Sequence, residues 1–401
     1  MTVVIELFDQ EEPLNNILST TALRPDLLVV LGDGQISKAK TQRPLLGFLQ
    51  AMGLSTQTRF IPCRTYDIAH IAAAMESVLE QYGPENCIID VLGGSDTLLL
   101  AAGCCCRNRP EVRVITLRDR TQQLLWLSGP LQQTTLPLAF SPTVSDLIAL
   151  AGGEALRHGH IDRSAITQSM QTLICRMFTV YQQYRNRWPQ FVQYLQQLIT
   201  SRYATGEALT YCGPRQFRLG RKQLAVDLEI MMALAEVGVV VDFHMNAANC
   251  TIRLASEQIA DYLCDVGSWL ELYVYTMLLR SGTFHDVDIN VVVSWDDDED
   301  DADIINELDV IAADGIGQLF ISCKTGVPDN AVLNEIETLT QRFGTRYAVP
   351  VLVTPCNLEQ EAPGVFRRAL EMGVFLLDRD DLPEEAFLER LRTVRKRWNM
   401  A

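Results

Sequence analysis

Residues 306–324, NELDVIAADGIGQLFISCK, decide the fold of the C-terminal part of the chain. The segments Asn306–Ala313 and Gly317–Cys323 are short and rich in apolar and β-branched residues, and a turn-rich link separates them. This pattern is typical of two strands joined in an antiparallel hairpin. Such a hairpin places Asp309 beside the segment Ser322–Lys324.

The elements predicted around this hairpin complete the order αβββαβ. In chain order they are a helix at Gly267–Leu279, a strand at Val287–Trp295, the two hairpin strands, a helix at Ala331–Phe343 and a strand at Ala348–Val353. This order resembles the core of the PD-(D/E)xK nucleases. We therefore expect a restriction-endonuclease-like domain over residues 261–401.

Two residues of the hairpin fit the chemistry of phosphodiester hydrolysis. That reaction needs carboxylates to hold Mg²⁺ or Mn²⁺ and a cation to orient water or offset charge. Asp309 and Lys324 fit these roles, and the backbone carbonyl of Cys323 can add a metal ligand. The alternative is an ordinary cross-strand salt bridge, but a charged pair on otherwise apolar strands is costly without a purpose.

The resemblance implies further residues of the site. The family motif has an acid two residues before the lysine, where this chain has Ser322. Family members with Ser-x-Lys take the missing carboxylate from the next helix, which implies Glu335 or Glu337. We prefer Glu337 because it lies nearer the apolar face of that helix. The acid of the first core helix corresponds to Glu271, which could instead face solvent. The predicted catalytic residues are Asp309, Lys324, Glu271, Glu337 and Ser322, and the predicted metal ligands are Asp309, Glu337, Glu271 and Cys323.

The N-terminal half has the pattern of a parallel α/β sheet. Three apolar runs, Val3–Phe8, Leu27–Leu31 and Cys87–Leu92, each precede turn residues and a helical stretch. In an open Rossmann-like sheet, ligands bind beyond the carboxyl ends of the strands, so the loops there form the predicted crevice. Its candidate ligand-binding residues are Asp9, Gln10, Gly32, Asp33, Gly34, Gln35, Lys38, Gly93, Gly94, Ser95, Asp96 and Thr97.

The turn at residues 93–97, GGSDT, sets amides and hydroxyls at the start of a helix, a natural place for phosphate. An ordinary strand-to-helix turn capped by Ser95 or Asp96 is the alternative. The order of strands and this turn resemble the CARF domain of CRISPR-associated proteins over residues 1–150, with a Gly-Gly-Ser sequence in place of Gly-Gly-Thr. The resemblance implies a cyclic oligoadenylate ligand. Asp96 stands where many members have lysine, and Lys38, Lys40 and Arg64 can compensate.

Residues 151–260 are expected to form a mainly helical connector between the domains, with a small wing-like hairpin at residues 237–254. Within it, Arg215, Arg218, Arg221 and Lys222 form a dense basic stretch. These cations could contact a nucleic-acid backbone or simply be solvated. The sequence leaves both readings open.

Composition narrows the function classes. The formal net charge is −16, which argues against a broad basic surface for nucleic acid and leaves only local sites. The 11 cysteines show no metal-binding or disulfide spacing, and the five histidines do not suggest a zinc site. A run of acids at residues 296–303 is interpreted as a solvated loop. No apolar run is long enough to span a bilayer and the N-terminus lacks a signal peptide, so we expect no membrane and a cytoplasmic location.

The two domains together resemble the DUF1887 group of type III CRISPR ancillary nucleases. This resemblance implies a homodimer that binds a cyclic oligoadenylate, with cyclic tetra-adenylate the foremost candidate, and then cleaves a DNA or RNA substrate with Mg²⁺ or Mn²⁺. Two alternatives remain open. The protein could be a ligand-binding regulator with an inactive nuclease fold, or a nuclease without a nucleotide switch.

Overall fold

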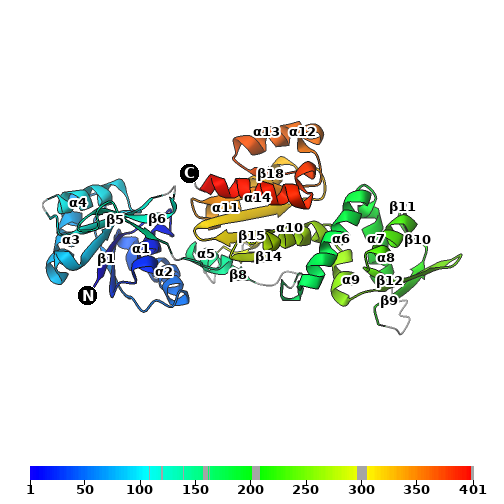
Figure 1. Ribbon diagram of the computed structural model, residues 1–401, viewed down its shortest axis with the longest axis horizontal. Helices are drawn as coiled ribbons and strands as arrows, with labels where there is room; N and C mark the ends of the chain where they lie inside the picture. Colours follow the sequence, from blue (N-terminus) through cyan, green and yellow to red (C-terminus); the bar gives the residue numbers. More distant parts are fainter. Residues whose placement is uncertain are drawn as a thin grey trace.

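The computed structural model describes residues 1–107, 109–118, 121–138, 140–156, 161, 163–200, 208–295 and 305–398. These ranges form an elongated molecule (Figure 1). The N-terminal domain, in blue and cyan, lies at one end, the C-terminal domain, in yellow and red, lies in the centre, and the green middle region lies at the other end. The middle region, expected as a connector, lies beyond the C-terminal domain and not between the two domains. The acidic run at residues 296–303 lies outside the described residues.

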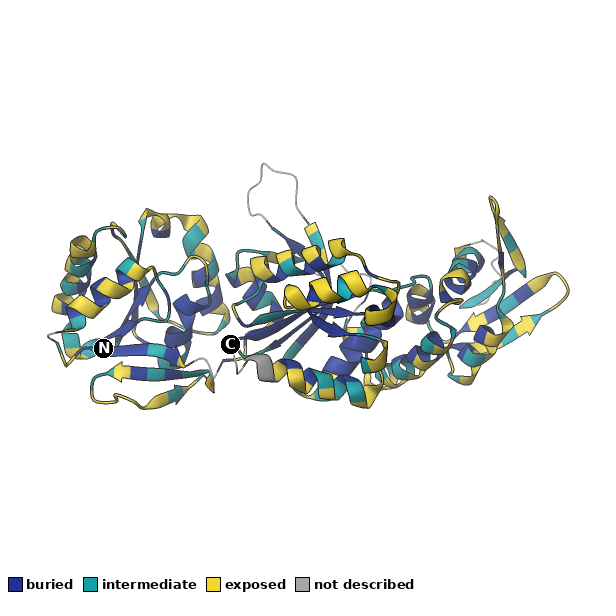
Figure 2. Ribbon diagram, turned by 90° about the horizontal axis from the view of Figure 1, so that it is seen from above, coloured by how far each residue is buried: buried dark blue, intermediate teal, exposed yellow. Residues whose placement is uncertain are grey.

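The N-terminal domain is built on one sheet in the order β3-β2-β1-β4-β5-β6-β7. Its parallel strands are β1 (Val3–Leu7), β2 (Leu27–Gly32), β3 (Gln57–Pro62), β4 (Cys87–Asp90) and β5 (Arg113–Arg118), and β6 (Gln123–Ser128) and β7 (Thr135–Pro137) run antiparallel. Its helices are α1 (Asn15–Leu23), α2 (Ala39–Ala51), α3 (Ile68–Tyr82) and α4 (Asp96–Cys106). Along β1, Val4 packs in the core with α1 and α2, whereas Val3 and Ile5 pack with α3 and α4. Both faces of the sheet are thus buried (Figure 2), as expected for a Rossmann-like sheet.

A pair of acids is buried in this sheet. Glu6 on β1 lies opposite Asp90 on β4, and both side chains are fully buried. Burial raises the pKa of Asp90 to about 7 and also raises the pKa of Glu6, where the neighbouring Asp90 adds to the effect. The pair is therefore most stable when it carries at least one proton.

The acid pair predicts that stability falls as pH rises. The folded state holds the proton of Asp90 more tightly than the unfolded chain does, so the free energy of unfolding falls from about pH 4 until the pH exceeds the folded pKa. Asp90→Asn should raise the melting temperature at pH 8.5 by roughly 5 °C and flatten its change between pH 6 and 8.5. Thermal melts of the full chain test this, with the exposed Asp380→Asn as control. An unchanged pH slope in Asp90→Asn would contradict it.

The C-terminal domain contains the predicted αβββαβ order. Its sheet has the order β18-β17-β16-β15-β14-β8. The strands are β14 (Asp286–Ser294), β15 (Ile305–Asp314), β16 (Gly317–Cys323), β17 (Ala348–Val353) and β18 (Phe375–Leu377), and the helices are α10 (Ser268–Ser281), α11 (Asn330–Phe343), α12 (Leu358–Glu361), α13 (Pro363–Glu371) and α14 (Glu384–Trp398). Strands β14, β15 and β16 are antiparallel neighbours, and β17 runs parallel to β16. The hairpin predicted from residues 306–324 is confirmed.

A short segment joins the two domains. It consists of α5 (Val144–Leu150) and β8 (Glu154–Leu156), and β8 pairs with β14 at the edge of the C-terminal sheet. The two domains also contact each other directly. The backbone N–H of Arg346, before β17 in the C-terminal domain, donates a hydrogen bond to Oε2 of Glu12 in the N-terminal domain at 3.1 Å. Phe343 and Gly344 at the end of α11 line a small hollow with Pro13 of the N-terminal domain.

The middle region is a separate bundle with its own sheets. Its elements are α6 (Gln168–Tyr184), α7 (Trp188–Thr200), β9 (Thr210–Pro214), β10 (Gln216–Leu219), β11 (Lys222–Ala225), α8 (Leu228–Glu236), β12 (Val240–Met245), β13 (Asn249–Leu254) and α9 (Glu257–Leu263). It contacts the C-terminal domain along α6, where Phe178 stacks on Tyr273 of α10 at 3.7 Å between ring centroids. The predicted wing-like hairpin is present as β12 and β13, and β9 completes its sheet. Across the described ranges, no helix is long and apolar enough to cross a membrane.

Candidate active site and ligand crevice

The hairpin brings Asp309 and the Ser-x-Lys segment together. The register that pairs Val310 with Ile321 sets Asp309 opposite Ser322. Asp309 Oδ2 accepts hydrogen bonds from the backbone N–H of Cys323 at 2.6 Å and from Ser322 Oγ at 3.3 Å, and Lys324 Nζ lies 3.5 Å away. Three donors thus converge on one carboxylate. The predicted neighbourhood is confirmed, whereas the contact from Cys323 is through its N–H and the carbonyl role stays a prediction.

A small pocket of about 30 Å³ opens at this site. Its polar lining comes from Glu307, Asp309, Ser322, Lys324 and Glu335. Glu335 lies on α11 and is close enough to help raise the pKa of Lys324. Burial alone would lower that pKa, but the surrounding acids, Asp309 foremost, outweigh it. Lys324 is therefore a firmly charged ammonium.

Of the two glutamates of α11, the structure places Glu335 and not the preferred Glu337 at the pocket. Glu337 is not among the residues that line the pocket, and its carboxylate accepts a hydrogen bond from Gln341 one turn along α11. The preference rested on distance from the apolar face of the helix. That criterion does not select the pocket residue, because the pocket lies beside Ile336 and Leu339 in the middle of α11, and the exposed Glu335 lines it with them.

Glu271 is half-buried and lies on the side of α10 that faces β14. Burial, followed by the nearby charge of Asp309, raises its pKa to about 8. Its Oε2 accepts a hydrogen bond from Asn290 Nδ2 at 2.9 Å. The alternative that Glu271 is a solvated helix residue is therefore excluded.

Asn290 is a candidate site residue that the sequence analysis missed. It lies in β14 between the pairs that join Ile289 to Val310 and Val291 to Leu308, which places it opposite Asp309. Its φ of 49° is a left-handed conformation that asparagine tolerates better than most residues. Its side chain is buried, and its Oδ1 has no hydrogen-bond partner within the described part of the chain. An asparagine within a predicted β-strand was the available signal.

In the N-terminal domain, the three predicted loops converge. They follow the adjacent parallel strands β2, β1 and β4. A Cβ added to Gly93 would lie 2.8 Å from the Cβ of Asp9, and one added to Gly32 would lie 2.9 Å from the Cβ of Phe8. Gly94, with a φ of 90°, packs equally close to Leu7. Only glycine fits these close approaches.

Several predicted ligand-binding side chains serve the loops themselves. Asp9 accepts hydrogen bonds from the N–H groups of Glu11 and Glu12 and from Asn15. Asp33 similarly accepts from the N–H of Gln35. These two acids therefore hold their turns and are less available to a ligand. Among the other predicted residues, Gln10, Gly34, Gln35, Lys38, Ser95 and Asp96 are exposed, Gly94 and Thr97 are half-buried, and Gly32 and Gly93 are buried.

Thr97 ties the Gly-Gly-Ser turn to the loop after β3. Its Oγ1 donates to the backbone carbonyl of Thr65 and lies 3.0 Å from Ser95 Oγ. Beside it, Tyr66 is 83% exposed. The turn, the start of α4 and this loop thus form one rim of the crevice.

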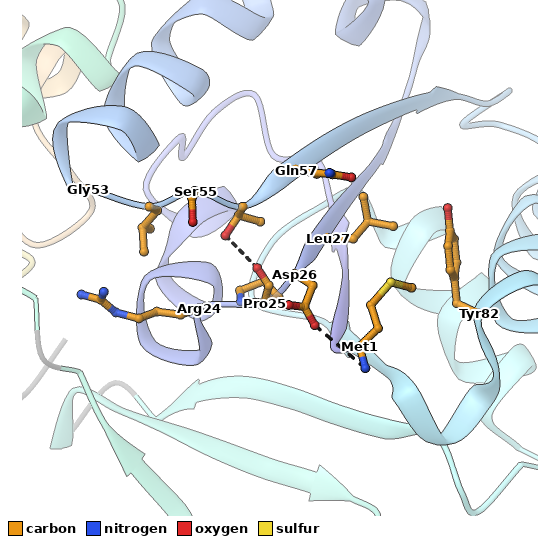
Figure 3. Close-up of a pocket in the computed structure, with 11 residues that line it drawn as sticks. Met1, Arg24, Pro25, Asp26, Leu27, Gly53, Ser55, Gln57 and Tyr82 are labelled. Carbon is orange, nitrogen blue, oxygen red and sulfur yellow. Dashed lines mark hydrogen bonds and ion pairs between the residues drawn. The ribbon is translucent and has the colours of Figure 1, made fainter.

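A larger hollow of the N-terminal domain lies away from this crevice (Figure 3). It has a volume of about 750 Å³ and is lined by Met1, Arg24, Leu27, Gln57 and Tyr82 among others. Leu27 and Gln57 begin β2 and β3, so this hollow lies at the amino ends of the strands. None of the predicted ligand-binding residues lines it.

The geometry of the C-terminal site agrees with a comparison of sequence families. Residues 260–395 match the Card1-like endonuclease domain. The Card1-like domain contains Glu271, Asn290, Asp309, Lys324 and Glu335, so the whole candidate site falls within it. The expected nuclease class is confirmed for this part of the chain.

Two solved structures are similar over nearly the whole chain. One is the crystal structure of protein VC1899 from Vibrio cholerae, with a TM-score of 0.73, 18% identity and coverage of 99% of this chain and 98% of that chain. The other is the structure of Can2 from Sulfobacillus thermosulfidooxidans in complex with cyclic tetra-adenylate, with a TM-score of 0.69, 18% identity and coverage of 98% and 97%. At this identity the two structures show the fold only. Because each covers nearly the whole chain, the shared fold extends beyond the Card1-like domain to the N-terminal domain and the middle region. Curated proteins gave no match.

Proposed function

We propose that this chain is a metal-dependent nuclease that a cyclic oligoadenylate, foremost cyclic tetra-adenylate, activates in type III CRISPR defence. The observation that carries the proposal is the Asp309, Lys324 and Glu335 cluster inside a Card1-like endonuclease domain. The activator is supported by the similar fold of Can2, whose structure contains cyclic tetra-adenylate, and by the converging loops of the N-terminal domain.

The residues of the site fit a hard divalent cation. Carboxylate and amide oxygens are the ligands that Mg²⁺ and Mn²⁺ prefer. Asp309, Glu335 and Glu271 would hold the ion, with the unpartnered Oδ1 of Asn290 as an additional oxygen. The bound ion would polarise the phosphodiester and acidify the attacking water. Within the described ranges, no three His, Cys, Asp or Glu side chains are yet placed to hold a metal ion together, so these carboxylates would have to draw closer when the ion binds.

The protein's own residues have distinct tasks in this proposal. Lys324 orients the attacking water and offsets the negative charge that develops on the phosphate. Ser322, in place of the motif acid, holds the Asp309 carboxylate by its hydroxyl. Asn290 positions Glu271 through its amide.

A homodimer is part of the proposal. An exposed apolar group beside the crevice, here called the α4 patch, comprises Tyr66, Ile68, Leu99 and Leu100. Leu100 is 56% exposed although it lies in the middle of α4. Such a patch beside a ligand site is typical of a surface that a second copy covers. Pairing there would place two crevices next to each other.

The test is cleavage of labelled single- and double-stranded DNA and RNA with Mn²⁺, with and without cyclic tetra-adenylate. We expect cutting that needs both the ion and the ligand. Ser322 favours one other candidate, a ligand-binding regulator without catalysis, because a metal ligand of the family motif is missing. Metal-dependent cleavage that is lost in Lys324→Ala would exclude the regulator, whereas ligand binding without cleavage would support it.

The two glutamates of α11 give a matched pair of variants. Glu335→Gln should lower kcat by about a hundredfold, because one metal ligand loses its charge. Glu337→Gln should leave the rate within about twofold, because its carboxylate faces Gln341 outside the pocket. Initial rates over a Mn²⁺ titration measure both. Equal losses in the two variants would remove Glu335 from the proposed site.

A further inference from the structure

The middle region carries an exposed basic hairpin, defined as residues 215–225 and built from β10 and β11. It contains Arg215, Arg218, Arg221 and Lys222 and no acidic residue. Arg218, Arg221 and Lys222 are exposed, and Arg215 is half-buried. Four cations in this short span are unusual in a chain whose net charge is −16.

The cations of the basic hairpin are not engaged by the protein's own acids. Within the described part of the chain, none of their side chains forms an ion pair. Arg187 in the same region is different, because it pairs with Asp227 at 3.2 Å and with Glu229 at 2.5 Å. The positive charge of the hairpin is therefore available to an external anion.

The hairpin is firmly anchored. Phe217 packs against Tyr194 of α7 with ring centroids 5.5 Å apart, and Leu224 is buried. At its base, the N–H of Arg215 donates to Ala248 at 3.0 Å and the N–H of Val226 donates to Arg215 at 2.9 Å. A fixed backbone lowers the entropy lost when the cations bind a partner.

The neighbouring helix α8 does not carry the cations that the basic hairpin has. Helix α8 lies after the basic hairpin in the chain, and β13 lies between β9 and β12 in the adjacent sheet. The exposed side chains of α8 include Glu229, Met232 and Glu236 and no Lys or Arg. The side chains of α8 therefore offer no positive contact to a phosphate backbone, in contrast to the basic hairpin.

We infer that the basic hairpin binds the sugar-phosphate backbone of the nucleic-acid substrate, without sequence preference and apart from the catalytic pocket. Nucleic acid fits because closely spaced, unpaired Arg and Lys side chains match a regular row of phosphates and release its counterions. The hairpin lies at the end of the molecule farthest from the N-terminal domain (Figure 1). The pocket lies in the central C-terminal domain, so a substrate that reaches both must extend from that domain onto the middle region. This inference rests on the proposed nuclease function.

The test measures binding without cleavage. Fluorescence anisotropy with labelled 40-nucleotide single-stranded and duplex DNA and RNA, in EDTA, compares the full chain with Arg218→Glu/Arg221→Glu. A matched control with the same change of charge is Arg107→Glu/Arg367→Glu, both exposed residues outside the middle region. We expect the hairpin variant to bind nucleic acid at least about tenfold more weakly than the wild type. The slope of log K against log salt concentration should become less steep by about two, and the control variant should match the wild type.

The outcomes separate this inference from the proposed function. Equal binding by the wild type and the hairpin variant, or equal losses in the variant and its control, would overturn the inference. A third outcome is nucleic-acid binding that depends on the hairpin, in a protein that shows no cleavage with Mn²⁺ and cyclic tetra-adenylate. This outcome would support the inference that the hairpin binds nucleic acid and would contradict the proposed nuclease function. Circular dichroism of both variants checks that the folds are intact.

Discussion

Asp309→Ala is expected to lower metal-dependent cleavage by at least about a thousandfold. The Asp309 carboxylate accepts hydrogen bonds from the N–H of Cys323 and the hydroxyl of Ser322, and it forms an ion pair with Lys324. Its removal takes away a proposed metal ligand and leaves a half-buried ammonium without its nearest acid. Losses of several kcal/mol in barrier height are usual for such groups, and each 1.36 kcal/mol is about tenfold in rate.

A control for this variant lies on the same strand. Asp314 ends β15, is similarly half-buried and pairs with Arg395 at 2.8 Å, far along the strand from the pocket. Asp314→Ala should keep the cleavage rate within about threefold while losing some stability. Single-turnover rates and calorimetric binding of cyclic tetra-adenylate should be measured for both variants. Similar rates in the two would remove Asp309 from the catalytic centre.

Gly93→Ala should raise the concentration of cyclic tetra-adenylate needed for half-maximal activation by about tenfold. The added Cβ would lie 2.8 Å from the Cβ and 2.9 Å from Oδ2 of Asp9, so the two loops must separate. Overpacking of this kind costs about 1–3 kcal/mol, and 1.4 kcal/mol corresponds to a tenfold change in affinity. The rate at saturating ligand should change much less.

The matched control is Gly103→Ala in α4, where an added Cβ meets no atom within 4 Å. Alanine is the better helix former, so this variant should keep its ligand affinity and gain a little stability. Calorimetric titration and cleavage over a ligand series test both variants. Unchanged affinity in Gly93→Ala would show that the Gly-Gly-Ser turn does not shape the ligand site.

The sequence was sufficient for the parts of the fold where hydrophobic pattern and turn chemistry agree. The hairpin from Ile305 to Cys323 is the clearest case, because a tight turn fixes the register and the register alone sets Asp309 opposite Ser322. Strands β1, β2 and β4 of the N-terminal sheet are buried along their whole length, so their apolar runs were equally clear. In both cases a local rule determined which side chains meet.

The sequence was insufficient where the answer depended on contacts between distant elements. The choice between Glu335 and Glu337 depends on where α11 sits relative to the end of β16, and helical period cannot supply that. The role of Asn290 needs both its left-handed backbone and the approach of α10. The place of the middle region depends on how α6 packs on α10, which no pattern in either helix specifies.

The hydrogen bond between Glu12 and the N–H of Arg346 has a thermodynamic consequence. Glu12 belongs to the loop that Asp9 organises at the crevice, and Arg346 follows the helix that carries Glu335. If binding of the activator shifts that loop, the crevice and the nuclease pocket are coupled. The coupling free energy is then the same in both directions, so each ligand changes the affinity for the other by the same factor. Substrate engaged at the nuclease pocket would then retain the activator by the same factor by which the activator favours substrate binding. The duration of the signal would depend on how much target nucleic acid is still present.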